Sequence, residues 1–195
     1  AEDIAFHEAV QFWFFSQWKA LKDHANGLGV QIIGDLPIYV SLDSADVWSE
    51  RKEFLLDETG RPSRVAGVPP DYFSEEGQLW GNPLYDWAAQ KRDGFGWWIR
   101  RVEGASRLFD AIRIDHFRAF ERYWSIPAGA ETAKEGQWEP GPGMDLLRVL
   151  TGWFPHITYI AEDLGLLTPE VHQLREAAGL PGMKVLEFAF SGPGN

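Results

Sequence analysis

The chain has 195 residues, 45% of them hydrophobic, a size that suits one globular domain and falls short of the ~250 residues of a complete (β/α)8 barrel. Its formal net charge of −11 argues against a nucleic-acid or membrane-surface partner, because those contacts need clustered Lys and Arg. Cysteine is absent, which excludes disulfides, thiolate metal sites and a Cys nucleophile.

The first elements are a helix, a strand and a long loop. Apolar residues recur at helical spacing through residues 4–25, and Asn26 begins a typical helix stop. The apolar run at residues 30–33 predicts a short buried strand that ends before Gly34. Residues 41–83 are rich in Pro, Gly, Asp and Ser and lack periodicity. So long a stretch predicts a binding loop or lid rather than a simple connector.

A second helix, strand and loop follow. Residues 87–107 predict a helical stretch that is broken around Gly94 and Gly96. Residues 109–115 then read as a strand. The irregular residues 126–143 predict a second long loop.

The last third repeats the alternation of helix and strand. Residues 145–153 predict a short helix, residues 156–161 a strand, residues 168–179 a helix that begins at Thr-Pro, and residues 183–190 a final strand. Strands separated by helices indicate an α/β fold with a parallel sheet. We therefore expect about four βα units in one unit spanning residues 1–195, with long loops at the C-terminal ends of the strands.

Charged side chains gather at the ends of two of these strands. Because side chains alternate along a strand, Arg113 and Asp115 share one face, near the C-terminal end where barrel enzymes place their chemistry. In the next strand Ile160 and Glu162 share a face. If the two strands are neighbours, Asp115 and Glu162 border one opening.

Two carboxylates about 5 to 5.5 Å apart can carry out retaining glycosyl transfer. The Arg113 cation favours ionised Asp115, the nucleophile, and a nearby negative charge favours protonated Glu162, the acid. The alternative is a structural ion pair between Arg113 and Asp115, with Glu162 only ending a strand. His116 can bond either a substrate hydroxyl or a backbone group. No His-x-His or His-Glu-x-x-His spacing occurs, so we expect no metal site.

Six motifs, in order, resemble the amylomaltase type of 4-α-glucanotransferase, which is glycoside hydrolase family 77 of the α-amylase superfamily. They are GDLPIYV at 34–40, DSADVW at 43–48, GVPPDYFS at 67–74, GQLWGNPLY at 77–85, RIDHFR at 113–118 and AEDLG at 161–165. The resemblance covers essentially the whole chain.

This resemblance implies a central part of a catalytic (β/α)8 TIM barrel, with further strands on either side of residues 1–195. It implies transfer of a segment of an α-1,4-glucan to the 4-hydroxyl of glucose or another glucan, with Asp115 as nucleophile, Glu162 as acid/base and no cofactor. The donors would be maltooligosaccharides or glucans derived from starch or glycogen. The implied substrate-binding residues are Asp35, Asp71, Tyr72, Phe73, Gln78, Trp80, Arg113 and His116.

The family pattern also places a third carboxylate beyond Asn195, so we expect the 195-residue chain alone to be inactive. The implied location is the bacterial cytoplasm, or a plastid in a plant. Two alternatives stay open: an α-glucan hydrolase of the same superfamily, and a non-catalytic glucan-binding half-barrel. No feature indicates an oligomeric state.

Overall fold

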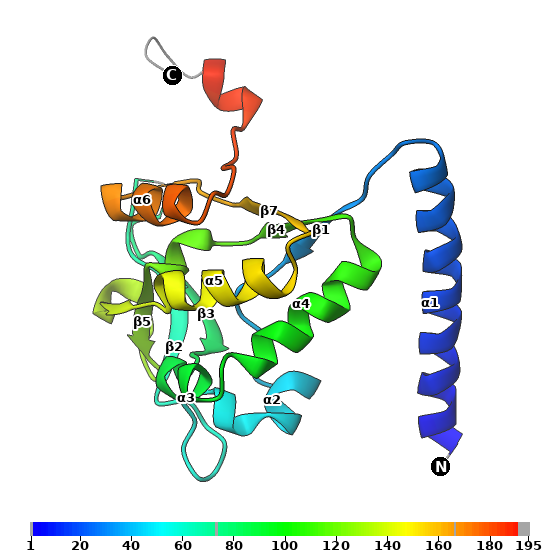
Figure 1. The fold of residues 1–195 in the computed structure, drawn as a ribbon. Helices are drawn as coiled ribbons and strands as arrows, with labels where there is room; N and C mark the ends of the chain where they lie inside the picture. Colours follow the sequence, from blue (N-terminus) through cyan, green and yellow to red (C-terminus); the bar gives the residue numbers. More distant parts are fainter. Residues whose placement is uncertain (1, 73, 166, 191–195) are drawn as a thin grey trace.

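The computed structural model describes residues 2–72, 74–165 and 167–190, and its strands form two sheets (Figure 1). One sheet is parallel, in the order β1-β4-β7, and the other is antiparallel, in the order β3-β2-β5-β6. The parallel strands are β1 (Ile33–Leu36), β4 (Ala111–Ile114) and β7 (Thr158–Ala161). The antiparallel strands are β2 (Arg64–Val68), β3 (Gln78–Pro83), β5 (Arg122–Pro127) and β6 (Gln137–Pro140).

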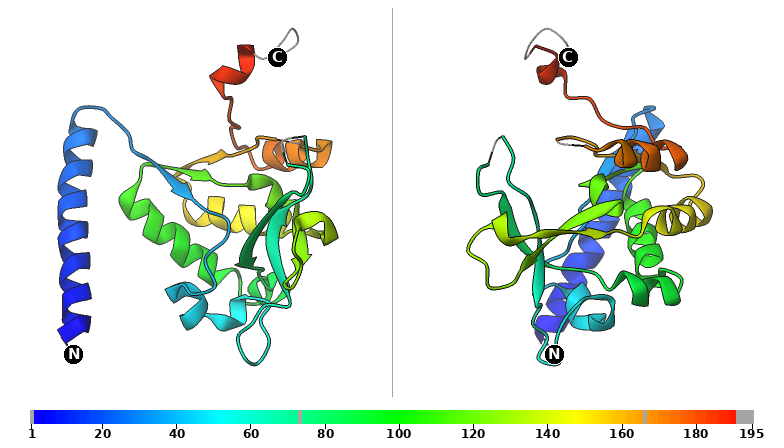
Figure 2. Two further views of the ribbon diagram at one scale, coloured as in Figure 1. Left: turned by 180° about the vertical axis from the view of Figure 1, so that it is seen from behind. Right: turned by 90° about the vertical axis from the view of Figure 1, so that its left-hand side faces the viewer.

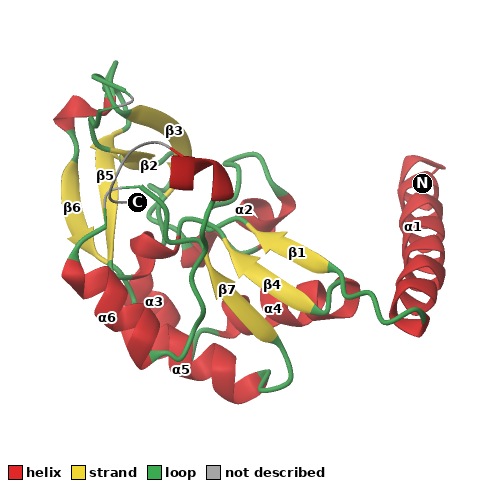
Figure 3. Ribbon diagram, turned by 90° about the horizontal axis from the view of Figure 1, so that it is seen from above, coloured by secondary structure: helices red, strands yellow, loops and turns green. Residues whose placement is uncertain are grey.

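The parallel sheet is the frame of the molecule. Helices α4 (Gly96–Leu108) and α5 (Gly143–Trp153) lie along one of its faces (Figure 3). Ile112 and Ile114 point to that side and are fully buried, in one core with leucines of α5. Burial of such side chains contributes about 1.5–3 kcal/mol each. The opposite face of β4 is left to charged side chains.

The predicted helices are confirmed, with small changes at their ends. They are α1 (Glu2–Gly27), α3 (Trp87–Arg92), α4, α5 and α6 (Pro169–Ala177). The predicted break between α3 and α4 occurs at Gly94 and Phe95, whose φ angles of 76° and 61° cannot continue a right-handed helix. Helix α1 stands to one side of the sheets and has no buried residue (Figure 2). None of the helices within the described ranges has the length and apolar character needed to span a bilayer.

The two long loops were only partly predicted. Residues 41–83 contain helix α2 (Ala45–Ser49) and strands β2 and β3, and residues 126–143 contain β6 and the end of β5. Strands β2, β3 and β6 were not predicted, because Gly and Pro interrupt the pattern and because pairing such as that of β2 with β5 joins residues far apart in sequence. At Gly67, for example, a Cβ atom would overlap the carbonyl oxygen of Gln78 on the neighbouring strand.

Two strand predictions were wrong. The first strand is β1 at Ile33–Leu36, not residues 30–33, because pairing with β4 begins where Ile33 faces Ala111. The final strand predicted at residues 183–190 is absent from the described part of this segment, where Leu186–Phe190 forms a 3-10 turn. A strand needs a neighbour for its backbone groups, and β7 bonds instead to Pro181, whose carbonyl oxygen accepts from the Ala161 N–H at 2.8 Å. The described residues thus form an α/β fold with three parallel strands and no closed barrel.

Candidate active site

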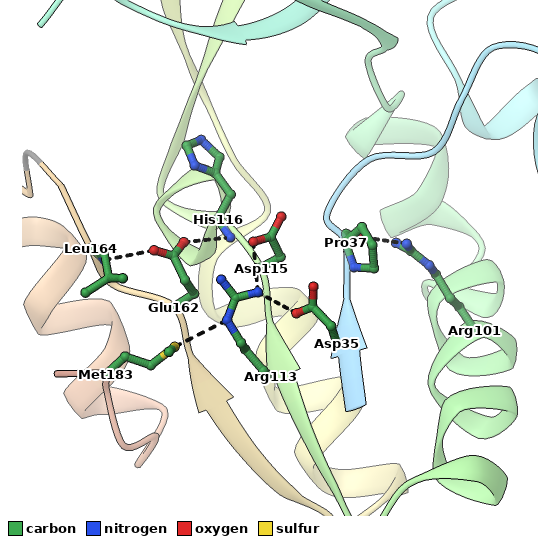
Figure 4. A network of polar contacts seen from close by, with 9 residues as sticks. All are labelled: Asp35, Pro37, Arg101, Arg113, Asp115, His116, Glu162, Leu164 and Met183. Carbon is green, nitrogen blue, oxygen red and sulfur yellow. Dashed lines mark hydrogen bonds and ion pairs between the residues drawn. The ribbon is translucent and has the colours of Figure 1, made fainter. Parts of the chain in front are cut away.

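The carboxyl ends of the three parallel strands bring acidic side chains to one edge of the sheet. Asp35 lies in β1, Asp115 follows β4 and Glu162 follows β7 (Figure 4). The ladder continues past the strand ends, because the Asp115 N–H donates to the Leu36 carbonyl at 3.1 Å and the Glu162 N–H to the Ile114 carbonyl at 3.0 Å. The predicted neighbouring positions of Asp115 and Glu162 are therefore confirmed.

Arg113 is the cation of this edge. Its Nη1 donates to Asp35 at 2.5 Å and to Asp115 at 3.0 Å, which confirms that Arg113 and Asp115 share a face. Its Nε lies 3.3 Å from the sulfur of Met183. Burial lowers the pKa of Arg113, but the hydrogen bonds and charges of Asp35 and Asp115 outweigh burial and raise the pKa overall. The guanidinium therefore stays charged between the two carboxylates.

Glu162 is half-buried and both of its carboxyl oxygens accept backbone hydrogen bonds. The His116 N–H donates to Oε2 at 2.9 Å and the Leu164 N–H to Oε1 at 3.2 Å. Burial raises the pKa of Glu162, and these two donors and Arg113 only partly oppose it. The predicted upward direction is confirmed. The predicted main cause, a nearby negative charge, was wrong. Burial makes the largest contribution to the rise in pKa, and the charge of Asp115 makes the smallest.

His116 lies between the two sheets. Its backbone is left-handed, with a φ angle of 48°, and its ring meets Trp80 edge to face at a centroid distance of 4.9 Å. Burial, with a smaller contribution from the charge of Arg118, lowers the pKa of His116 to about 4. The imidazole is neutral near pH 7 and can donate one hydrogen bond and accept another.

The antiparallel sheet supplies a second wall. Trp80 donates through Nε1 to the Gln78 side chain at 2.9 Å and packs against Tyr39. In the loop between β2 and β3, Asp71 Oδ1 accepts from the Ser74 N–H at 2.8 Å, and the Tyr72 side chain is exposed. Phe73, predicted to bind substrate, lies outside the described residues.

A cavity of about 200 Å³ joins the two walls. Its lining includes Asp71, Gln78, Trp80, His116 and Glu162, so the structure brings these predicted residues together. The other predicted residues, Asp35, Arg113 and Asp115, are joined by ion pairs at the strand ends beside this cavity. Within the described ranges, no group of three or more His, Asp or Glu side chains is arranged to hold a metal ion.

The sequence profile of glycoside hydrolase family 77, 4-alpha-glucanotransferase, matches residues 1–195. The chain belongs to this family. It is 58% identical over 190 residues to the 4-alpha-glucanotransferase of Thermus thermophilus, an alignment that covers 97% of this chain and 38% of that protein. It is 52% identical over 182 residues to the chloroplastic/amyloplastic 4-alpha-glucanotransferase of Solanum tuberosum, covering 93% of this chain and 32% of that one.

A solved structure agrees with these sequence relatives. The amylomaltase from Streptococcus agalactiae in complex with acarbose superposes with a TM-score of 0.93 at 45% identity, covering 97% of this chain and 38% of that one. The chain thus spans well under half the length of the 4-alpha-glucanotransferases it matches. The resemblance inferred from the six motifs is confirmed.

Some residues of this candidate site were not predicted. Arg118 lines the cavity, and its guanidinium carbon lies 4.1 Å from the ring centroid of Trp138 on β6. Arg118 ends the RIDHFR motif, so its position close to Asp115 in the sequence could have identified it as a site residue. Nothing local in the sequence marks Trp138, because its approach depends on the pairing of β5 with β6.

Proposed function

We propose that this segment supplies the nucleophile and the acid/base of a 4-alpha-glucanotransferase that moves a segment of an α-1,4-glucan onto the 4-hydroxyl of glucose or another glucan. One observation carries the proposal. In a chain of this family, Asp115 and Glu162 end adjacent parallel strands, and the backbone amide of His116, the residue after Asp115, donates to Glu162 at 2.9 Å. The chemistry is a retaining double displacement.

In the first half of the reaction, Asp115 is ionised and Glu162 is protonated. The contact with Arg113 at 3.0 Å supports the first state, and burial, which raises the pKa of Glu162, supports the second. The Asp115 carboxylate forms a bond to the anomeric carbon as the bond to the glycosidic oxygen breaks. Glu162 gives its proton to that departing oxygen, which leaves as the 4-hydroxyl of the shorter glucan.

In the second half, the acceptor replaces the departed glucan. Esterified Asp115 carries no charge, and Glu162 is now a carboxylate that takes the proton of the acceptor 4-hydroxyl. The acceptor oxygen bonds to the anomeric carbon, and Asp115 leaves as a carboxylate. The net change is one glycosidic bond broken and one formed, with no cofactor consumed.

The surrounding residues would bind and shield the glucan. Trp80 offers a partly exposed aromatic face to a sugar ring, and Gln78 and neutral His116 offer hydrogen bonds to hydroxyl groups. Asp71 and Tyr72, with Phe73 as predicted from the sequence, belong to the loop over the cavity. Exclusion of water by this loop would favour transfer to a sugar over hydrolysis.

We also propose that residues 1–195 form the central part of a (β/α)8 barrel, with β1, β4 and β7 as successive barrel strands. The parallel order β1-β4-β7 and the 38% coverage of the Thermus thermophilus relative support this reading. The substrates would be maltooligosaccharides or glucans from starch or glycogen. The location would be the cytoplasm of a bacterium, or a plastid if the source is a plant, as the name of the Solanum tuberosum relative suggests.

A chimera tests the activity. Residues 1–195 replace the matching segment of the Thermus thermophilus enzyme, and the products formed from maltotriose are separated by chromatography. Glucose together with oligomers longer than maltotriose means transfer, whereas shorter products alone mean hydrolysis and contradict the proposal. Asp115→Asn in this Thermus chimera should abolish turnover, while Asp23→Asn, on the exposed side of α1, should leave it unchanged. A fully active Asp115→Asn chimera would refute the assigned nucleophile.

The third possibility, a binding module, is separated by calorimetry. Maltotriose that binds the Thermus chimera with no products of either kind would support a non-catalytic role. The 195-residue chain alone should show no turnover, because it spans only 38% of the length of the Thermus thermophilus relative.

A further inference from the structure

The turn after β4 has an unusual backbone. His116 has a φ angle of 48°, and Phe95 is the other non-glycine residue in the described ranges with a positive φ. A residue with a side chain adopts this conformation at a cost in free energy unless its surroundings compensate. Such strain at a candidate active site calls for a specific benefit of the geometry.

The benefit is a set of bonds between the ends of β4 and β7. The left-handed turn directs the His116 N–H to Glu162 Oε2 at 2.9 Å. The next amide, of Phe117, donates to the Glu162 backbone carbonyl at 3.1 Å, and the Glu162 N–H donates to Ile114 at 3.0 Å. Three residues next to Asp115, Ile114 before it and His116 and Phe117 after it, are thus bonded to Glu162. The backbone on either side of Asp115 cannot move away from Glu162 without breaking these bonds.

Two contacts hold the turn in this conformation. The His116 ring lies edge to face against Trp80 at 4.9 Å. The His116 carbonyl oxygen accepts from the Ala119 N–H at 3.0 Å, which closes the following 3-10 turn, Phe117–Phe120. Packing on one side and a backbone bond on the other therefore offset the strain.

We propose that His116 is a positioning residue that acts through its backbone, whose left-handed turn holds the Glu162 carboxyl at a fixed place relative to Asp115. This role is separate from any contact of the imidazole with sugar. The inference rests on the proposed function, in which Asp115 and Glu162 react with the same glycosidic bond.

The turn has an electrostatic consequence that can be measured. An N–H donor stabilises the carboxylate form, so the His116 amide lowers the pKa of Glu162 against the larger effect of burial. Removal of this single donor should raise the pKa of Glu162 further. If the turn at His116 served only folding, removal of the donor would not raise the pKa of Glu162.

The first experiment replaces the amide N–H of His116 by an ester oxygen, using the α-hydroxy acid analogue of histidine, which keeps the imidazole. Carboxyl 13C NMR of the glutamate-labelled 195-residue chain follows the titration of Glu162, whose signal is the one lost in Glu162→Gln. We expect the midpoint to rise by about one pH unit, the size of one charge-assisted hydrogen bond. The matched control is an ester at Ala119, which removes a bond of the same turn without contact to Glu162.

An unchanged midpoint in the His116 ester, or an equal rise in the Ala119 ester, would overturn the inference. The same two esters, introduced into the Thermus chimera, allow the effect on kcat and kcat/KM to be measured. The alkaline limb of kcat/KM should move upward for the His116 ester alone, and kcat should fall about tenfold. An inactive parent chimera would count against the proposed function, while the NMR titration would still decide the role of the turn.

A second experiment uses side-chain variants of His116 and needs no ester. Asn tolerates a left-handed backbone and Leu, of similar size, does not. His116→Asn should keep the Glu162 midpoint of the parent chain, and His116→Leu should raise it. Equal midpoints in the two variants would contradict a backbone role. Loss of folded NMR dispersion in His116→Leu alone would support it, because the two variants differ in their tolerance of this turn.

Discussion

The two sheets of this molecule bring different kinds of chemistry to one cavity. The parallel sheet brings charge, through Arg113, Asp115 and Glu162 at strand ends whose backbone groups are bonded to neighbouring strands. The antiparallel sheet brings Gln78 and Trp80, which are neutral. Small displacements of reacting atoms are costly, and Arg113 and Asp115 lie on or directly after β4, the central strand of the parallel sheet. Gln78 and Trp80 lie on β3, an edge strand of the antiparallel sheet.

Substitution at the parallel sheet should have the largest effect. In the Thermus chimera, Glu162→Gln removes the proposed proton donor, and we expect turnover of maltotriose to fall about 10²- to 10⁴-fold. A maltosyl fluoride donor, whose leaving group needs little protonation, should still form the glycosyl ester. Burial raises the pKa of Glu162, so the parent rate should decline as pH rises through that pKa, and the variant should lose this limb.

The control for this substitution is Glu103→Gln, on the exposed side of α4, which should keep parental rates. Equal losses with maltotriose and maltosyl fluoride would contradict the acid role of Glu162. They would point instead to a general disturbance of the site.

The charged half of the site was predictable because its rules are local. Strand alternation alone puts Arg113 and Asp115 on one face, and the short parallel strands align their ends. The weight of burial at Glu162 was not predictable. It depends on how the turn at His116 and the loop at Leu164 close around the carboxyl group, and no periodicity in the sequence reports that closure.

For the antiparallel sheet, the sequence predicted the site residues but not the strands that carry them. The GQLWGNPLY motif identifies Gln78 and Trp80 through resemblance, but the sequence predicts a loop where the structure has strand β3. Antiparallel pairing between residues as distant as Gly67 and Trp124 leaves no short-range pattern when Gly and Pro interrupt the strands. The final predicted strand failed for a related reason, since an apolar run becomes a strand only beside a partner.

A substitution inside the antiparallel sheet should have the next largest effect. A Cβ atom at Gly67 would overlap the Gln78 carbonyl, so Gly67→Ala should separate β2 from β3 and lower the free energy of unfolding by about 1–3 kcal/mol. In the Thermus chimera, displaced Gln78 should raise KM more than it lowers kcat. Urea unfolding and maltotriose kinetics measure the two effects.

The matched control is Gly104→Ala in α4, where a Cβ atom meets nothing within 4 Å. There we expect a gain of about 0.5–1 kcal/mol, because alanine is the better helix former. If Gly67→Ala were as stable as the parent, the close approach of β2 and β3 would be wrong.

Trp80 tests the division between binding and chemistry more directly. Trp80→Ala in the Thermus chimera removes an aromatic face worth about 1 kcal/mol, so KM for maltotriose should rise several-fold to tenfold. Trp80→Phe should recover part of the loss. Trp153→Ala, at the exposed end of α5, is the control and should leave KM unchanged. A fall in kcat with unchanged KM would show that the antiparallel sheet acts on chemistry after all.

The smallest effect concerns the attachment of the antiparallel sheet to the parallel one. The Arg118 guanidinium carbon lies 4.1 Å from the Trp138 ring centroid, a cation–π contact between the loop after β4 and strand β6. Such contacts contribute about 0.5–2 kcal/mol, more where water is excluded. Trp138→Leu keeps an apolar side chain and loses the contact.

Because Arg118 has other interactions, a double-mutant cycle with Arg118→Met is needed to isolate the pair. Unfolding free energies of the parent chain, the two single variants and the double variant should give a coupling of about 0.5–1 kcal/mol. Hydrogen exchange should show faster opening of β5 and β6 in Trp138→Leu, with β4 and β7 unaffected. Uniform acceleration across both sheets would mean that they open as one unit, and the contrast between a charged parallel sheet and a separately opening antiparallel sheet would not hold.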